Sequence, residues 1–291
     1  MKSFLETWKI IEAEELGTNK PVPLSKITPQ LAQVAVASGK KDNNEKDDKA
    51  QGAKKDEEVA VGALLPMQKE VIPMKALGMA LQYLLGRFDK LTNMEAIVSS
   101  DNYIMDGHHR WAAATLINPN TMVKVTRIGI PAAQLITALN IWTKAEGKSG
   151  KPGKGDISQF ATAIPSLIDE VMNKGIPDQT DKNTGGIVKG LTIDEVKQAF
   201  AKLGNGDANV GANLMKENAA KLPTQKHPNT PERVDMPVVE GQKEIDDVVN
   251  RLLRGDIDWN FPLSKDTEIA KILTKPILQL RNKMLIWPQN L

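Results

Sequence analysis

The sequence predicts an α+β protein, with a small mixed-sheet domain followed by a mainly helical C-terminal half. Residues 21–135 contain the order strand, helix, hairpin, helix, strand, which is typical of a small α+β domain. Residues 157–291 instead carry apolar side chains at helical spacing. Hydrophobic residues make up 41% of the 291 residues, which is enough to build a sizeable core.

The composition excludes several classes of site. The chain has no cysteine, which rules out disulfides, thiol catalysis and thiolate metal ligands. The net charge of +2 gives no argument of its own for a nucleic-acid partner. No apolar run reaches the roughly 18 residues that a membrane span requires, and the N-terminus is too charged for a signal peptide. We therefore expect a cytoplasmic protein that does not contact a membrane.

The first elements are an amphipathic helix and a short strand. Residues 1–20 predict the helix, because large apolar side chains recur there at helical spacing; it either packs on the protein or binds a partner. The stretch "VPLSKITP" predicts the strand, closed by Pro29. Residues 38–58 have blocks of charge and no apolar side chain larger than alanine. They predict a disordered insertion.

Five further elements complete the predicted α+β domain. A stripe from Leu77 to Leu85 predicts a helix that ends near Gly86. The remaining elements are two strands joined by the turn "SDN", then a helix, then a strand, in the stretches "EAIVSS", "NYIMDG", "RWAAATLI" and "MVKVTRIGI".

Residues 143–156 are rich in glycine and lysine and predict a flexible linker to the C-terminal half. They include "GKS", but a P-loop would need glycine where Trp142 stands. The lysines there could follow a nucleic-acid backbone without sequence preference.

Helices dominate the predicted C-terminal half. Thr192 and Glu195 form a capping box, and Gly204 ends that helix. Similar stripes occur in "EIDDVVNRLLRG", "DTEIAKILTK" and "ILQLRNKMLIW". The proline-rich residues 221–241 predict an extended segment across the surface.

The stretch "YIMDGHHRWAAATL" carries the candidate chemistry. A strand that ends at Asp106, a turn at Gly107 and a helix that follows place free backbone N–H groups at one point, which predicts an anion site. Arg110 can bind two phosphate oxygens, and His108 and His109 can donate from ring nitrogens. Asp106 predicts a Mg²⁺ ligand, a general base or the helix N-cap. A purely structural turn, with packed or solvated histidines, remains an alternative.

The same residues resemble the ParB/sulfiredoxin-like superfamily, in which a G-x-H-R type turn holds nucleotide or nucleic-acid phosphates. The resemblance lies in "DGHHRWAAA" with its flanking "AIVSSDNYIM" and "VKVTRI". "VPLSKITP" is similar to the family's first strand, and "LLPMQKEV" to its proline-x-glutamine segment. The resemblance implies a ParB/sulfiredoxin-like mixed sheet that binds ATP or CTP with Mg²⁺.

The resemblance also implies roles for seven residues. The phosphate contacts would be Gly107, His109, Arg110 and Gln68, and the catalytic residues would be Asp106, Glu70 and His108. Asp106 would also bind the metal, and Glu70 would be a candidate base. Sulfiredoxin activity is excluded, because it needs a cysteine where this chain has His108. A partition clamp is disfavoured, because no helix-turn-helix is evident after the domain.

Two functions follow as hypotheses. The first is Mg²⁺-dependent phosphoryl transfer or hydrolysis, as in a nuclease, an NTPase or a kinase, with a nucleotide as ligand and DNA as a second candidate. The second is a non-catalytic DNA-associated or structural phage protein that keeps the fold for binding; its location would be the host cytoplasm or the virion. Protein partners would contact the N-terminal helix or the C-terminal half.

Overall fold

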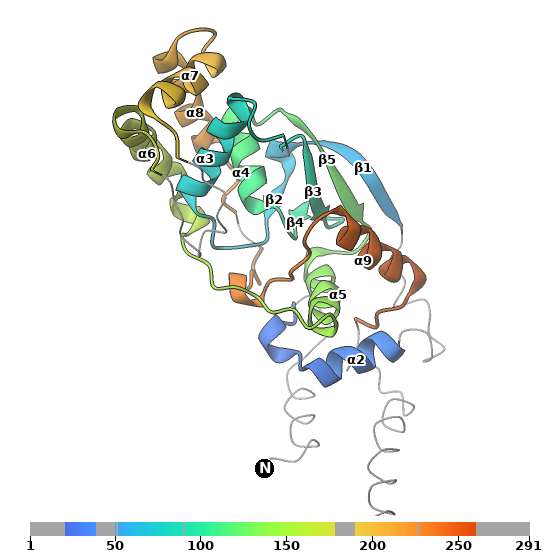
Figure 1. Cartoon of the computed structure of the whole chain (residues 1–291). Coiled ribbons are helices and arrows are strands. Elements are labelled where there is room, and N and C mark those ends of the chain that lie inside the picture. Colours follow the sequence, from blue (N-terminus) through green and yellow to red (C-terminus); the bar gives the residue numbers. More distant parts are fainter. Residues whose placement is uncertain are drawn as a thin grey trace, which may run out of the picture.

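The computed structural model describes residues 21–38, 50, 52–89, 91–177, 190–225 and 227–259 (Figure 1). The predicted N-terminal helix, the two predicted helices after residue 259 and most of the segment 38–52 lie outside these residues. The described part is an α+β structure with a mixed sheet in the N-terminal half and a mainly helical C-terminal half, as predicted.

The described strands form a five-stranded sheet in the order β1-β5-β3-β4-β2. The strands are β1 (Ala53–Ala60), β2 (Leu65–Pro66), β3 (Asn93–Val98), β4 (Tyr103–Ile104) and β5 (Met122–Ile128). Two neighbouring pairs are antiparallel, β1 with β5 and β3 with β4, whereas β3 with β5 and β2 with β4 are parallel. The predicted hairpin is confirmed as β3 and β4, and Asn102 in its turn has φ 69°.

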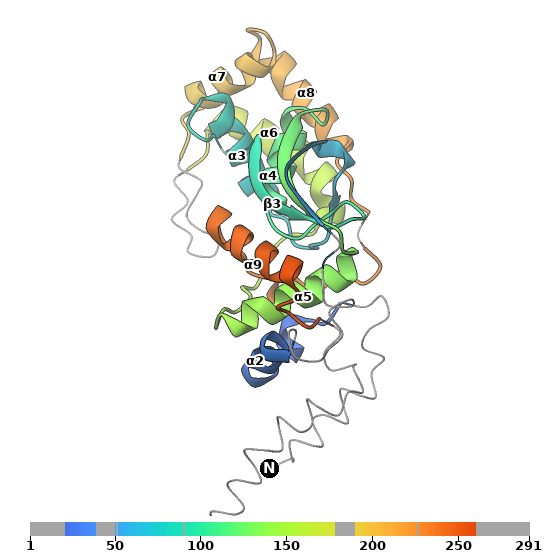
Figure 2. The same ribbon diagram turned by 90° about the vertical axis from the view of Figure 1, so that its right-hand side faces the viewer.

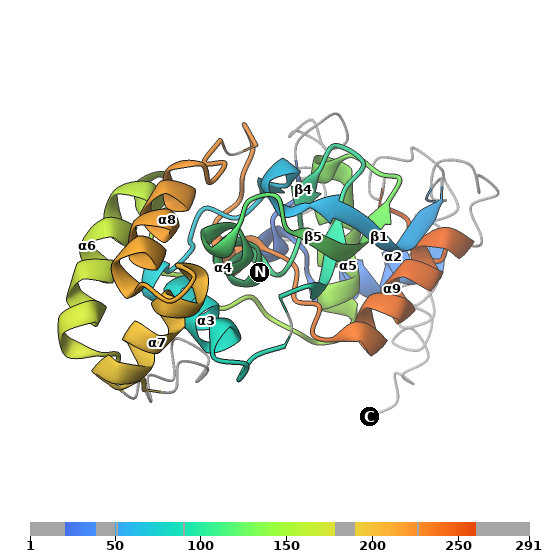
Figure 3. The same cartoon turned by 90° about the horizontal axis from the view of Figure 1, so that it is seen from above.

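Each face of the sheet has its own hydrophobic core. Successive strand residues point to opposite faces, so Val98 and Ile104 pack with α3 (Pro73–Leu84) and α4 (His108–Ile117), whereas Ile97 and Met105 face the other side. That second face is covered by α5 (Ala132–Ala145) and α9 (Gln242–Arg254), with α2 (Pro29–Ser38) packed beyond α5. Figure 3 shows the sheet between the two sets of helices.

The C-terminal half is divided between the two sides of the sheet. Helices α6 (Phe160–Lys174), α7 (Ile193–Leu203) and α8 (Ala208–Ala220) pack outside α3 and α4, while α9 returns to the opposite face (Figures 1 and 2). Asn218 of α8 links the two parts by donating its amide to the carbonyl oxygens of Leu116 and Ile117, at 3.2 and 2.9 Å. Helix α5 runs continuously through the domain boundary predicted at residue 135.

Several predicted helix boundaries are confirmed. Helix α3 ends just before Gly86, and α7 begins with the capping box of Thr192 and Glu195. The described residues of the segment 221–241 are largely irregular apart from a short 3-10 turn at Arg233–Asp235. Among the described helices, none is both long enough and apolar enough to cross a membrane.

The prediction of a strand in "VPLSKITP" is wrong. Leu24–Lys26 form a 3-10 turn, and α2 begins at Pro29. Proline is well tolerated at the first position of a helix, where its missing N–H has no intrahelical partner. The alanine-rich stretch that follows buries Ala32 and Ala35 against the α5 side of the protein, so Pro29 begins an element instead of ending one.

Part of the predicted insertion 38–58 is ordered, because residues 53–58 belong to β1. The strand lies at the sheet edge, and most of its charged side chains are exposed. Glu57 pairs with Arg127 of β5 at 2.8 Å. Charged residues are common on edge strands, where they prevent pairing with other chains; composition alone therefore misread an edge strand as disorder.

The segment 143–156 is not a loose linker. Residues 143–145 complete α5, and two of the glycines beyond it, Gly150 and Gly155, lie against other backbone segments. A Cβ atom at Gly150 would lie 2.0 Å from the carbonyl oxygen of Val234, and one at Gly155 would lie 2.6 Å from that of Val71. Glycine serves here for close backbone approach rather than for flexibility.

Candidate phosphate-binding site

A pocket of about 520 Å³ lies at the N-terminal end of α4. Its walls come from the start of α3, the turn into α4, the segment after α5 and the segment before α9. The charged lining residues are Lys75, Asp106, Arg110, Lys151, Arg233 and Glu240. The pocket therefore combines residues from both halves of the chain.

Gly107 makes the turn into α4. Its φ of 89° lies in the left-handed region, which glycine adopts without the steric penalty of a Cβ. The first intrahelical bond runs from the Trp111 nitrogen to the Gly107 carbonyl, so the amides of residues 108–110 have no partner within the helix. The N-cap is Gly107 and has no side-chain cap; the N-cap role considered for Asp106 is therefore wrong.

His108 is buried, and both of its ring nitrogens are used within the protein. Its Nε2 accepts hydrogen bonds from the backbone nitrogens of Met67 and Gln68, at 3.2 and 3.0 Å. Its other nitrogen bonds to the Ile104 carbonyl. Burial, followed by the charge of Arg233, lowers the pKa of His108 to about 3. The ring is therefore neutral and has no free nitrogen for the catalytic role that the resemblance implies.

His109 retains one nitrogen for a ligand. Its Nε2 accepts from the Ile72 nitrogen at 3.1 Å, so in the neutral ring the proton is on Nδ1. Burial, and then the charges of Lys75 and Arg233, hold the pKa of His109 well below its usual value. The ring lines the pocket and is only 9% exposed. Its Nδ1–H has no partner among the described residues.

Arg110 lines the pocket but is shared between two carboxylates. Its Nη2 lies 3.3 Å from the Asp106 carboxylate, and its Nη1 lies 3.5 Å from that of Glu95. The guanidinium folds back over Gly107, where an added Cβ would lie 3.5 Å from Nη2. Arg110 therefore helps to hold the turn as well as facing the pocket.

Three further cations line this pocket: Lys75, Lys151 and Arg233. Sequence reasoning missed Lys75 and Arg233, and it considered Lys151 only among the lysines of residues 143–156. None of them forms an ion pair with another described residue. Lys75 lies in the first turn of α3, where a positive charge opposes the helix dipole. Burial and the nearby Arg233 lower its pKa. Residues this far apart in sequence give no periodic signal that they meet.

Of the two residues predicted near the pocket, Gln68 lines it but Glu70 does not. The Gln68 side chain donates to the Glu70 carbonyl. The Glu70 carboxylate instead accepts a hydrogen bond from the Arg233 nitrogen at 3.0 Å. Glu70 and Asp106 are therefore not brought together as an acid and base pair, and Glu70 fixes the segment that carries Arg233.

Asp106 presents its carboxyl to the pocket, with 40% of its side-chain surface open. The surrounding protein raises its pKa by burial, while Arg110 and the Gly107 N–H act in the opposite direction. No group of three or more histidine, aspartate or glutamate residues in the described chain could hold a metal ion. Asp106 by itself does not make a dedicated Mg²⁺ site; a Mg²⁺ ion held by Asp106 would need the phosphates of a bound ligand to complete its coordination.

Comparison with known proteins gives no relative. No protein-family model, curated protein or solved structure matches this chain. The interpretation therefore rests on the geometry of the pocket. The N-termini of α3 and α4 meet there, and His109 of α4 accepts a hydrogen bond from the Ile72 nitrogen at the start of α3. Four cations and two carboxylates line the pocket.

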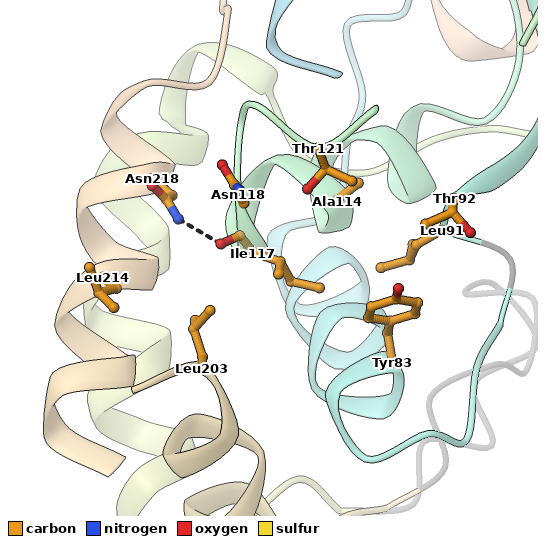
Figure 4. A pocket seen from close by; sticks show the side chains of 10 residues that line it. All are labelled: Tyr83, Leu91, Thr92, Ala114, Ile117, Asn118, Thr121, Leu203, Leu214 and Asn218. Atoms are coloured by element: carbon orange, nitrogen blue, oxygen red, sulfur yellow. Dashed lines mark hydrogen bonds between the residues drawn. The ribbon is translucent and has the colours of Figure 1, made fainter. Parts of the chain in front are cut away.

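A second pocket, of about 440 Å³, lies at the other end of α4 (Figure 4). It has no charged lining residue and is formed by Tyr83, Leu91, Thr92, Ala114, Ile117, Asn118, Thr121, Leu203, Leu214 and Asn218. None of the predicted site residues lines it. Its uncharged walls make the first pocket the better candidate for an anionic ligand.

Proposed function

We propose that this protein binds a phosphate-bearing ligand, a nucleotide or a nucleic-acid end, in the pocket at the start of α4. The observation that carries the proposal is the excess of positive charge there: Lys75, Arg110, Lys151 and Arg233 face two carboxylates. Helix N-termini attract anions, and their free N–H groups donate to phosphate oxygens. His109 adds a neutral donor that needs no counter-charge.

We also propose membership of the ParB/sulfiredoxin-like superfamily, with ATP or CTP as the candidate ligand. The position of the first strand supports this. Only the 3-10 turn Val61–Ala63 and one residue separate β1 from β2, so the strand leads directly into the "LLPMQKEV" segment. The first strand that the resemblance assigned to "VPLSKITP" would then be β1, with no insertion between it and this segment.

Phosphoryl transfer or hydrolysis is the catalytic form of this proposal, and it depends on Asp106. A carboxyl with a raised pKa in a phosphate pocket is suited to accept or deliver a proton. No step of the proposal uses a metal. The non-catalytic alternative keeps the same pocket for binding alone. Asp106→Asn separates the two: catalysis would be lost while phosphate binding is kept or improved, because a negative charge has been removed.

The test is a calorimetric and thermal-shift panel of ATP, CTP, ADP, GTP and short single- and double-stranded DNA. The proteins are wild type, Lys75→Ala and Arg110→Ala, with Arg251→Ala as control, because Arg251 pairs with Asp247 on the exposed face of α9. A ligand at 100 times its Kd should stabilise the folded state by about 2.7 kcal/mol. Wild type and control should respond, and the two pocket variants should respond less. No stabilisation of wild type by any ligand would refute the proposal.

A further inference from the structure

We propose that Arg233 and Lys151 form a second phosphate subsite, which makes the pocket prefer a di- or triphosphate chain over a single phosphate. The inference rests on the proposed phosphate-binding function and assigns its specificity to the C-terminal half. The first subsite is the turn into α4; the second lies on the segments before and after the outer helices α6, α7 and α8.

The placement of the unpaired cations favours a ligand with several phosphate groups. Arg110 already lies beside the carboxylates of Asp106 and Glu95. Lys75, Lys151 and Arg233 have no ion pair with a described residue. With Asp106 and Glu240 the four cations leave a net charge of +2, which one phosphomonoester at about −1.5 to −2 could balance, but a single phosphate group is too small to contact all three unpaired cations. A di- or triphosphate chain could contact the turn and the three unpaired cations together.

The second subsite is held by packed backbone. The Arg233 side chain lies over Gly153, where an added Cβ would be 2.7 Å from its Cδ, and Val234 lies against Gly150. The segment 150–153 that carries Lys151 is therefore in direct contact with the segment that carries Arg233. Glu70 fixes the Arg233 backbone with a 3.0 Å hydrogen bond. Because these segments are already positioned, little conformational entropy is lost when the ligand binds.

The cations also act on one another. The pKa of Lys75 is lowered by burial and then by the charge of Arg233, with smaller contributions from Arg110 and Lys151, while Asp106 acts in the opposite direction. Like charges held together in a concave site repel one another, and an anion that bridges them relieves this repulsion. Arg233 also lowers the pKa of both His108 and His109, which places its charge within electrostatic reach of the α4 turn. Both subsites line the same pocket of about 520 Å³, so one phosphate chain can contact both.

An apolar wall completes the pocket beside the cations. Met79 and Phe88 line it from the α3 side, and Met236, Pro237 and Val238 line it from the C-terminal segment. A pocket of about 520 Å³ is within the usual range for small-molecule sites, about 300 to 1,000 Å³. We therefore identify the ligand class as a small molecule that carries a di- or triphosphate and an uncharged group, such as a nucleoside.

The experiment uses probes that have no base, so that only the phosphate chain is compared. Calorimetry at fixed ionic strength would give the Kd of inorganic phosphate, pyrophosphate and tripolyphosphate for the full chain. Wild type should bind tripolyphosphate at least tenfold more tightly than phosphate. Arg233→Ala and Lys151→Ala should each reduce this ratio at least threefold and leave the Kd of phosphate within twofold. Arg251→Ala should behave as wild type.

The outcomes separate this inference from the proposed function. If wild type binds phosphate but the ratio is unchanged in both Arg233→Ala and Lys151→Ala, the second subsite is wrong and the phosphate site stands. A loss of phosphate and tripolyphosphate affinity by the same factor in these variants would also contradict it. If wild type binds none of the three probes, both proposals fail. Arg233→Lys, which keeps the charge, should retain most of the preference.

Discussion

The Nε2 atom of His108 lies 3.0 Å from the backbone nitrogen of Gln68. Through this bond and the bond to the Met67 nitrogen, the first turn of α4 holds the segment that follows β2. His109 does the same for Ile72 at the start of α3. The two adjacent histidines thus join three segments of the backbone at the pocket, and only His109 keeps a ring nitrogen for a ligand.

These buried histidines predict a loss of stability in acid. The folded pKa of His108 is about 3, below the value of about 6.5 expected in the unfolded chain. As the pH falls below 6.5, the unfolded state takes up a proton that the folded state cannot accept. The free energy of unfolding should therefore decrease between pH 6.5 and about 3, by up to about 1.4 kcal/mol per pH unit for this group.

Urea denaturation at several pH values from 7.5 to 4 would measure this slope. His108→Gln keeps a side-chain oxygen that can accept from the same amides but does not titrate, so its slope should be shallower by up to about 1.4 kcal/mol per pH unit. The raised pKa of Asp106 acts in the opposite direction at low pH, but it is present in both proteins and cancels in the comparison. Equal slopes would show that His108 is not buried neutral.

Gly107→Ala should destabilise the protein and weaken ligand binding. A residue with a Cβ at a φ of 89° is strained by about 1–2 kcal/mol, and this Cβ would contact Ala96 and the Arg110 guanidinium. Gly86→Ala is the matched control, because Gly86 has φ 77° with no atom within 4 Å of the added Cβ. Denaturation should show a loss in both variants, whereas calorimetry should show weaker phosphate binding only in Gly107→Ala. Equal binding by the two would argue against the turn as a phosphate contact.

Trp111→Phe should reduce stability without affecting the pocket. Trp111 is fully buried in the core, and its indole nitrogen donates to the Val61 carbonyl at 3.0 Å. Phenylalanine removes this donor, and the Val61 carbonyl then keeps only the 3.3 Å hydrogen bond from the Leu64 nitrogen. The expected loss is that of one hydrogen bond, about 0.5–1.5 kcal/mol. Chemical denaturation would report the difference. A variant as stable as wild type would mean that the hydrogen bond makes no net contribution.

Glu70→Ala should act through Arg233 rather than through proton transfer. Loss of the carboxylate frees the Arg233 backbone, so the preference for tripolyphosphate over phosphate should fall by at least twofold. Glu70→Gln still offers an oxygen to the same N–H and should stay close to wild type in this ratio. If any phosphoryl-transfer activity is found, loss of turnover in Glu70→Gln with normal binding would instead support the base role that the resemblance implies.

Local patterns were sufficient to predict much of the fold. The capping box at Thr192, the stripe of α3 and the hairpin of β3 and β4 depend on neighbouring residues, so the sequence alone identified them. The turn at Gly107 was also predicted, because a tight turn from a strand into a helix requires a left-handed residue there. Two elements were missed. The charged residues of β1 resemble a disordered segment in composition, because edge strands are often charged. Helix α2 was missed because Pro29, which begins it, can also end a strand.

The sequence by itself determined that this is an α+β chain in which Gly107 makes the turn into the helix that carries His108, His109 and Arg110. Only the tertiary structure decided which side chains surround that turn. In the folded chain, His108 accepts a hydrogen bond from the Gln68 backbone nitrogen, and the Glu70 carboxylate accepts one from the Arg233 backbone nitrogen. Folding also brings Lys75, Lys151 and Arg233 to one pocket from three distant segments. The physical reason is that burial and charge clustering depend on long-range packing across the sheet and its helices, which leaves no periodic trace in the order of residues.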